Sequence, residues 1–341
     1  MESVKVKVKS RNKTISIAKA IGIILMVIGH VFDKESWGVH YIYMFHMPLF
    51  FVLSGYFFKR PTNLKDVRLY IWKRIKGLYF PFIKWTLFFI LMHNFLFHFQ
   101  IGDGVYDVHS IAVNIFKSSV TFVGTEPVLV GFWFLKALFT AAVFYQILSY
   151  IFLRFRLFEP ILPMFILLLV LFQMMLCNTN KTILGMNLGA LFMYVGTQIR
   201  TFSIENKISD FKINILIALV ILVVSRSYTD VFHTEMLQVD KSTVLPFILT
   251  GILGSLLVLY VSKTLANYLH IGLKKIFLYI GDNTLIILAL HYPFYKIFEY
   301  YYVDKCGSKL TESIMGGVIG VCLPIMLQKL SAIIINRIKG I

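Results

Sequence analysis

The chain has 341 residues, of which 58% are hydrophobic, 16% aromatic and only 15% charged. Because an average soluble domain carries about 25% charged residues, this composition excludes an ordinary soluble protein and predicts a polytopic membrane protein. The net charge of +17 at pH 7 does not indicate nucleic-acid binding, since membrane topology accounts for most of the basic residues.

About ten segments are apolar over the 17 to 25 residues that a helix needs to cross roughly 30 Å of hydrocarbon. They are residues 15–32, 41–58, 79–100, 129–153, 160–177, 183–200, 211–227, 244–266, 276–297 and 313–335. Lysine and arginine accumulate in cytoplasmic loops. With the N-terminus inside, 22 of the 34 basic residues are internal and 8 are external. The sequence therefore predicts an all-α, polytopic membrane bundle of about ten transmembrane helices with both termini cytoplasmic.

One integral membrane domain accounts for residues 1–341. It comprises a basic cytoplasmic N-terminus (1–14), the helix bundle (15–335) and a cytoplasmic tail (336–341). The N-terminus looks like a signal peptide, but no small-residue cleavage site follows, so we interpret residues 15–32 as a retained span. No metal site and no disulfide framework is predicted, because neither CxxC nor metal-ligand spacing joins the three cysteines, Cys177, Cys306 and Cys322.

Two ionisable residues, Lys19 and His30, lie eleven positions apart in the first span. At about 100° per residue, eleven steps are three turns plus about 20°, so both side chains share one helix face, roughly 16 Å apart along its axis. Ionisable groups are costly in hydrocarbon and mark functional sites by default. The pair predicts chemistry inside the membrane, with Lys19 near the cytoplasmic side and His30 near the outer side.

Two further histidines, His46 in the second span and His291 in the ninth, fall at a depth similar to that of His30. Each of them alone is equally well explained by hydrogen bonding between helices. Histidine suits acyl transfer because it titrates near neutral pH and can take a proton from a hydroxyl group. A serine nucleophile is not indicated, since Gly-x-Ser-x-Gly is lacking and Ser54-Gly55-Tyr56 is better interpreted as a small-residue helix contact.

Basic residues crowd the internal loop between the second and third spans, and positive-inside topology explains most of them. Lys73, Arg74 and Lys76 differ because they lie where the next helix enters the membrane. A phosphate-bearing cytosolic ligand would bind there through charge-assisted hydrogen bonds. Topology alone explains these three residues equally well.

The longest external loop, residues 101–128, is long enough to act as a lid. Trp133 opens the fourth span and either belongs to the interfacial aromatic belt or forms a wall for a sugar ring. We expect Lys136 about 10 Å deeper than the start of this span, where it needs a partner or a water-filled cavity. Asp282 in the ninth span raises the same question and is a candidate partner for a buried lysine.

Five segments together resemble the acyltransferase-3 family of integral membrane O-acyltransferases. Two of them are specific in order and spacing, residues 17–30 and 45–56. The later three are weaker individually: residues 74–81, 133–135 and 281–293. The resemblance covers essentially the whole chain. One departure is Ser16, where relatives usually carry aspartate three residues before the basic position.

The resemblance implies that the bundle transfers an acyl group, usually acetyl from acetyl-coenzyme A, to a carbohydrate hydroxyl. By that match His30 is the catalytic histidine, Lys19 its basic partner along the donor's path, and the stretch around Arg74 faces the donor's phosphates. Acetyl-coenzyme A is then a substrate, with no permanently bound cofactor. The acceptor is expected to be a bacterial surface polysaccharide or its lipid-linked precursor, and the location the bacterial cytoplasmic membrane.

The acceptor-side candidates are His46, Trp133, Lys136 and His291. Two rivals stay open: a polysaccharide exporter or flippase with a similar bundle, and a regulatory membrane protein that binds no acyl donor. Transporters often show repeated halves with interrupted helices. The sequence predicts neither feature, which favours the enzyme.

Overall fold

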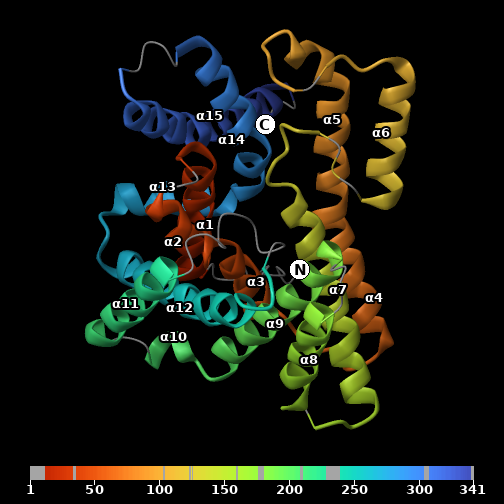
Figure 1. The fold of residues 1–341 in the computed structure, drawn as a ribbon, viewed down its shortest axis with the longest axis vertical. Helices are drawn as coiled ribbons and strands as arrows, with labels where there is room; N and C mark the ends of the chain where they lie inside the picture. Colours follow the sequence, from red (N-terminus) through yellow and green to blue (C-terminus); the bar gives the residue numbers. More distant parts are fainter. Residues whose placement is uncertain are drawn as a thin grey trace, which may run out of the picture.

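The computed structural model describes residues 12–33, 36–102, 104–122, 124, 126–158, 160–175, 180–207, 210–227, 239–302 and 307–338. Regular structure within these ranges is entirely helical (Figure 1). The predicted basic N-terminus up to Arg11, and the cysteines Cys177 and Cys306, lie outside them. The all-α expectation is thus confirmed for the described part of the chain.

The first half of the chain forms α1 (Lys13–Val31), α2 (Trp37–Tyr43), α3 (His46–Tyr56), α4 (Leu64–Arg74), the π-helical turn η1 (Ile75–Tyr79), α5 (Phe80–Phe97), α6 (Val108–Thr121) and α7 (Trp133–Arg154). The second half forms α8 (Ile161–Met175), α9 (Lys181–Thr201), α10 (Ile204–Lys207), α11 (Phe211–Ser227), α12 (Val244–Tyr268), α13 (Ile271–Asp282), α14 (Thr284–Tyr302) and α15 (Lys309–Ile338). Asparagine or aspartate side chains cap several of these helices; Asn12, for example, accepts from the amide of Ile15 at 3.2 Å.

Six helical stretches are each long and apolar enough to cross a membrane, as a multi-pass membrane protein requires. They are Lys13–Val31, Leu64–Phe97, Trp133–Arg154, Lys181–Thr201, Val244–Tyr268 and Lys309–Ile334. The predicted fifth and seventh spans correspond to the shorter α8 and α11, of 15 and 17 residues. The count of ten spans and the cytoplasmic position of the termini stay predictions.

The predicted second and ninth spans are each interrupted, so the expectation of unbroken helices was wrong. The second divides into α2 and α3, and the ninth into α13 and α14. At Asn283 the reason is local: its amide Nδ2 donates to the carbonyl of Tyr279 at 2.7 Å, and its Oδ1 accepts from Gln328 at 2.5 Å. Such side-chain bonds compete with the helical backbone pattern.

The predicted external loop at residues 101–128 contains a helix, α6, which runs antiparallel along α5 (Figure 1). Tyr79, just before α5, donates its hydroxyl to the carbonyl of Ser119 near the end of α6. The ring of Phe122 then lies 4.4 Å from that of Phe82. Phe132 also lies 5.9 Å from Phe82, so α7 begins beside the start of α5 and not beyond its end.

Glycines bring helix backbones into direct contact around the centre of the bundle. A Cβ atom on Gly55 of α3 would overlap the carbonyl of Met193 in α9, and one on Gly196 would overlap the carbonyl of Val52. Small residues permit such close approach in membrane helices. The interpretation of Ser54-Gly55-Tyr56 as a helix contact is confirmed.

Candidate active site

A cavity of about 510 Å³ lies between α1, α3, η1 and the first turns of α7 and α14. Its volume is in the range of ligand-binding pockets. One wall is a single face of α1, on which Lys19, Ile23, Met26 and His30 follow one another at helical spacing. The structure therefore brings Lys19 and His30 to the same cavity, as their spacing predicted.

A tyrosine and a second histidine surround the His30 end of this cavity. Tyr43 donates its hydroxyl to the carbonyl of Gly29 at 2.7 Å, and Tyr43 and His46 both line the cavity. Nδ1 of His46 lies 3.0 Å from the carbonyl of Ile42. Because a carbonyl only accepts, Nδ1 of His46 carries a proton in this bond.

His291 lies behind His30 and is not part of the cavity lining. The two ring centroids are 5.2 Å apart. Nδ1 of His291 lies 3.0 Å from the carbonyl of Ile287, while its Nε2 is buried without a hydrogen-bond partner among the described residues. The arrangement makes His291 a packing neighbour of His30. Its assignment to the acceptor side, which came from its expected depth in the ninth span, stays a prediction.

At the other end of the cavity, Arg74 is held in a fixed position. Its Nη2 donates to Ser54 Oγ at 3.0 Å and to the Tyr70 hydroxyl at 2.7 Å, and its guanidinium lies over the Tyr70 ring at 4.8 Å. Arg74 and Lys19 both line the cavity, so two cations meet there. Lys73 and Lys76 are exposed to the outside of the bundle, and of the three predicted donor-binding residues the structure places Arg74 in the cavity.

The region around Ser16 brings a carboxylate to the same face of α1. Ser16 donates from Oγ to Asp282 Oδ1 at 3.4 Å, and Lys19 lies one turn further along the helix. Close packing makes this contact possible, because Gly281 rests against the carbonyl of Ser16 where a Cβ atom would overlap. An acidic group thus approaches the Lys19 face from α13, although position 16 itself carries serine.

Trp133 lines the main cavity, whereas Lys136 lies in a second cavity that also touches Trp133. The expected depth of Lys136 was wrong. Hydrogen bonds from Leu129 to Glu126 and from Phe132 to Leu129 form turns, so α7 begins only at Trp133. Lys136 therefore lies in the first turn of its helix.

Sequence reasoning missed three residues that hold the site together: Tyr43, Ser54 and Tyr70. The sequence did contain a signal for Tyr70: Arg74 follows it by four positions, and residues four apart on a helix are neighbours. This spacing could have predicted the contact between Tyr70 and Arg74. Tyr43 and Ser54 act through tertiary contacts that carry no such spacing. Within the described ranges, no group of three or more His, Cys, Asp and Glu side chains is placed to hold a metal ion.

Cationic residues lie at one end and histidines at the other end of one cavity in this apolar helical bundle. The chain is a multi-pass membrane protein with a candidate active site inside the bundle. A family model for the acyltransferase domain matches residues 12–328 of the chain. The match covers nearly the whole sequence. The chain belongs to this acyltransferase-3 family and is an acyltransferase.

Among curated proteins, the chain is similar to nodulation protein NolL of Mesorhizobium japonicum (strain LMG 29417 / CECT 9101 / MAFF 303099), with 27% identity over 151 residues. The match covers 41% of this chain and 36% of NolL, so it spans little more than a third of that relative. No solved structure matches the chain.

Proposed function

We propose that this acyltransferase transfers an acetyl group from acetyl-coenzyme A to a carbohydrate hydroxyl of a bacterial surface polysaccharide or its lipid-linked precursor. The observation that carries the proposal is the single cavity lined by Arg74, Lys19 and His30. Coenzyme A carries its phosphates at one end and its reactive thioester at the other. A cavity with cations at one end and a histidine at the other matches that polarity.

In this proposal the donor's phosphates bind near Arg74, on the cytoplasmic side, and its thioester reaches His30 along the Lys19 face. The Arg74 guanidinium has five N–H donors, and its bonds to Ser54 and Tyr70 both come from Nη2. The N–H groups of Nη1 and Nε are then left to bind a phosphate. His30 takes the proton of the sugar hydroxyl as its oxygen attacks the thioester carbonyl. The carbon–sulfur bond breaks, the departing thiolate takes the proton from His30, and coenzyme A leaves as the thiol. An acyl-histidine relay through His30 is the variant of this route.

Replacing Arg74 with alanine is expected to raise the KM for acetyl-coenzyme A roughly tenfold to hundredfold, because a charged hydrogen bond contributes about 1.5–3 kcal/mol. Lys73→Ala is the matched control, since this neighbouring cation is exposed. Its KM should change less than about threefold, as for an exposed ion pair. Initial rates of thiol release from acetyl-coenzyme A in detergent measure both values. Equal effects of the two substitutions would argue against a specific donor contact at Arg74.

Transporters often contain interrupted helices, so the breaks in the second and ninth predicted spans remove one argument against a polysaccharide exporter. A cellular experiment separates polysaccharide export from acetyl transfer. A deletion strain is expected to export a normal amount of surface glycan that lacks the O-acetyl ester found in the parent. Mass analysis of glycan released from both strains measures this difference. Polymer retained inside the deletion strain would instead support export, and unchanged acetylation of the exported glycan would contradict the proposal.

A further inference from the structure

A second cavity, of about 360 Å³, adjoins the first at Trp133. It is bounded by Phe82 of α5, by described residues of the segment between α6 and α7, and by the first turns of α7 and α9. Its polar lining comes from Glu126, Lys136 and Thr182, and its apolar lining includes Phe82 and Trp133. The donor route proposed above does not use this cavity.

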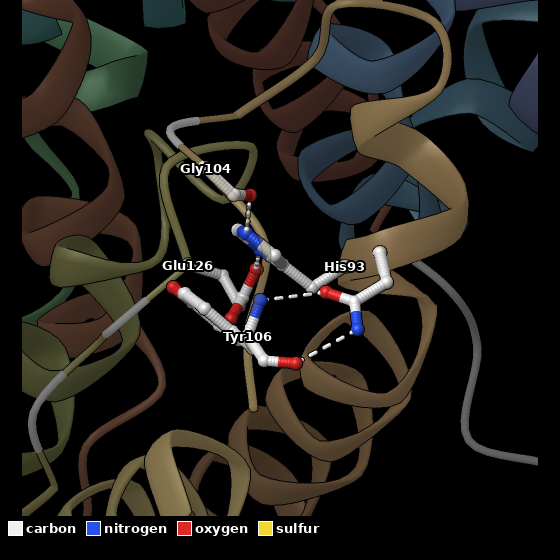
Figure 2. A network of polar contacts seen from close by, with 5 residues as sticks. His93, Gly104, Tyr106 and Glu126 are labelled. Carbon is white, nitrogen blue, oxygen red and sulfur yellow. Dashed lines mark hydrogen bonds and ion pairs between the residues drawn. The ribbon is translucent and has the colours of Figure 1, made fainter. Parts of the chain in front are cut away.

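Glu126 is a buried carboxyl group held at the edge of this cavity by a histidine from α5 (Figure 2). Its Oε2 lies 3.0 Å from Nδ1 of His93, whose Nε2 donates to the carbonyl of Gly104 at 3.2 Å. Oε1 is buried without a hydrogen bond of normal geometry to any described residue. Burial raises the pKa of Glu126, and the interactions of its carboxyl group with His93 and with the Tyr106 hydroxyl act in the opposite direction.

The His93–Glu126 pair belongs to a rigid support. The His93 ring stacks on the Tyr106 ring at 3.4 Å with 2° between their planes. Asn94 fixes the backbone of Tyr106 from both sides, because its side-chain amide donates to the Tyr106 carbonyl at 2.8 Å and accepts from the Tyr106 amide at 2.7 Å. Gly102 and Gly104 supply the positive φ angles, +105° and +78°, that the turn requires. The carboxyl group is therefore preorganised and not a loose surface charge.

The residues of this cavity have complementary binding capacities. A carboxylate accepts hydrogen bonds from hydroxyl groups, an ammonium group donates to oxygen atoms, and the apolar face of an indole packs against the C–H face of a ring. The Lys136 ammonium makes neither a hydrogen bond nor an ion pair with the described residues, and the side chain is half-buried. A compact molecule rich in hydroxyl groups meets all three requirements together.

We propose that this second cavity binds the sugar ring that receives the acyl group. The inference rests on the proposed acetyl transfer and adds the acceptor's location. Glu126 accepts from ring hydroxyls, Lys136 donates to ring or linkage oxygens, and Trp133 packs against the ring where the two cavities meet. His93 is a positioning residue, because it holds the Glu126 carboxyl group without reaching the sugar.

The test measures the KM of the acceptor separately from that of the donor. The acceptor probe is surface glycan from the source strain, de-O-acetylated with mild alkali, and the donor is acetyl-coenzyme A. Glu126→Gln retains a hydrogen-bonding group for His93, and Lys136→Met retains the apolar length of the side chain. Lys84→Met is the matched control, because Lys84 is exposed on α5 with its ammonium over Trp85.

Both cavity variants are expected to raise the glycan KM roughly tenfold or more, which corresponds to the loss of one charged hydrogen bond. Their KM for acetyl-coenzyme A should stay within about twofold of wild type, as should both constants of Lys84→Met. In a thermal-shift assay, the glycan should stabilise the wild type and Lys84→Met more than the cavity variants, while acetyl-coenzyme A stabilises all four proteins equally.

An unchanged glycan KM in Lys136→Met and Glu126→Gln would overturn the inference, as would a fall in kcat alone. If Glu126→Gln does not fold, the glycan KM of Lys136→Met alone tests the inference. A wild-type protein that transfers no acetyl group to the glycan contradicts the proposed function instead. The two failures are therefore distinguishable.

Discussion

Acyl transfer by a His30→Ala variant is expected to fall about 10²–10⁴-fold in kcat, the usual contribution of a general base. The alanine side chain cannot take the proton of the attacking hydroxyl, whereas Arg74 and Lys19 remain in place to bind the donor. The KM for acetyl-coenzyme A and the thermal shift that it produces should therefore change little. Radiolabelled acetyl transfer to the de-O-acetylated glycan measures kcat, and the thermal shift verifies folding.

Three other histidines make this experiment specific. His98 is exposed at the end of α5, and its replacement by alanine should leave kcat unchanged. His46 lines the same cavity as His30, so a larger loss in His46→Ala than in His30→Ala would move the catalytic role to His46. His291→Ala removes a packing neighbour of His30 and should lower kcat less than His30→Ala does. Wild-type transfer by His30→Ala would contradict the assignment.

The largest expected effect on stability is at Gly196. Alanine there would place a Cβ atom inside the backbone of α3 at Val52, and neither backbone can yield as a flexible side chain would. Overpacking typically costs about 1–3 kcal/mol and occasionally more, and a contact between two backbones falls at the upper end of this range. We expect Gly196→Ala to lower the unfolding temperature in detergent, and Gly55→Ala to do the same through Met193.

Gly317 in α15 is the matched control, because no atom lies within 4 Å of a Cβ added there. Alanine favours a helix over glycine by about 1 kcal/mol, so Gly317→Ala should leave the unfolding temperature unchanged or raise it. Equal unfolding temperatures for Gly196→Ala and Gly317→Ala would mean that α3 and α9 do not touch backbone to backbone.

Hydropathy and helical spacing predicted the parts of the structure that depend on one helix at a time. The shared face of Lys19 and His30 follows from geometry alone, and both residues line the cavity. Basic residues were predicted at the helix entrance, but spacing did not show that Arg74 turns inward while Lys73 and Lys76 turn outward. That choice depends on Ser54, which lies on another helix.

Features that depend on tertiary contacts were not predictable in this way. The break at Asn283 is fixed partly by Gln328 from α15, and α6 lies against α5 through contacts such as Phe82 with Phe122. The apolar residues in the predicted external loop were too few to indicate a span, yet sufficient to cover one side of α5. No sequence motif marks Glu126 as part of a site, because its partner His93 lies 33 positions away in the sequence.

The break between α13 and α14 has an electrostatic consequence. The first four N–H groups of a helix have no acceptor within that helix, and the aligned peptide dipoles place about half a positive charge there. Thr284 and Leu285, which begin α14, line the main cavity. The positive end of the α14 backbone dipole therefore lies beside the cavity, and its strength does not depend on the ionisation of Lys19 or Arg74. An uninterrupted helix through this point would have kept those N–H groups bonded within the helix and would have placed no helix end beside the cavity.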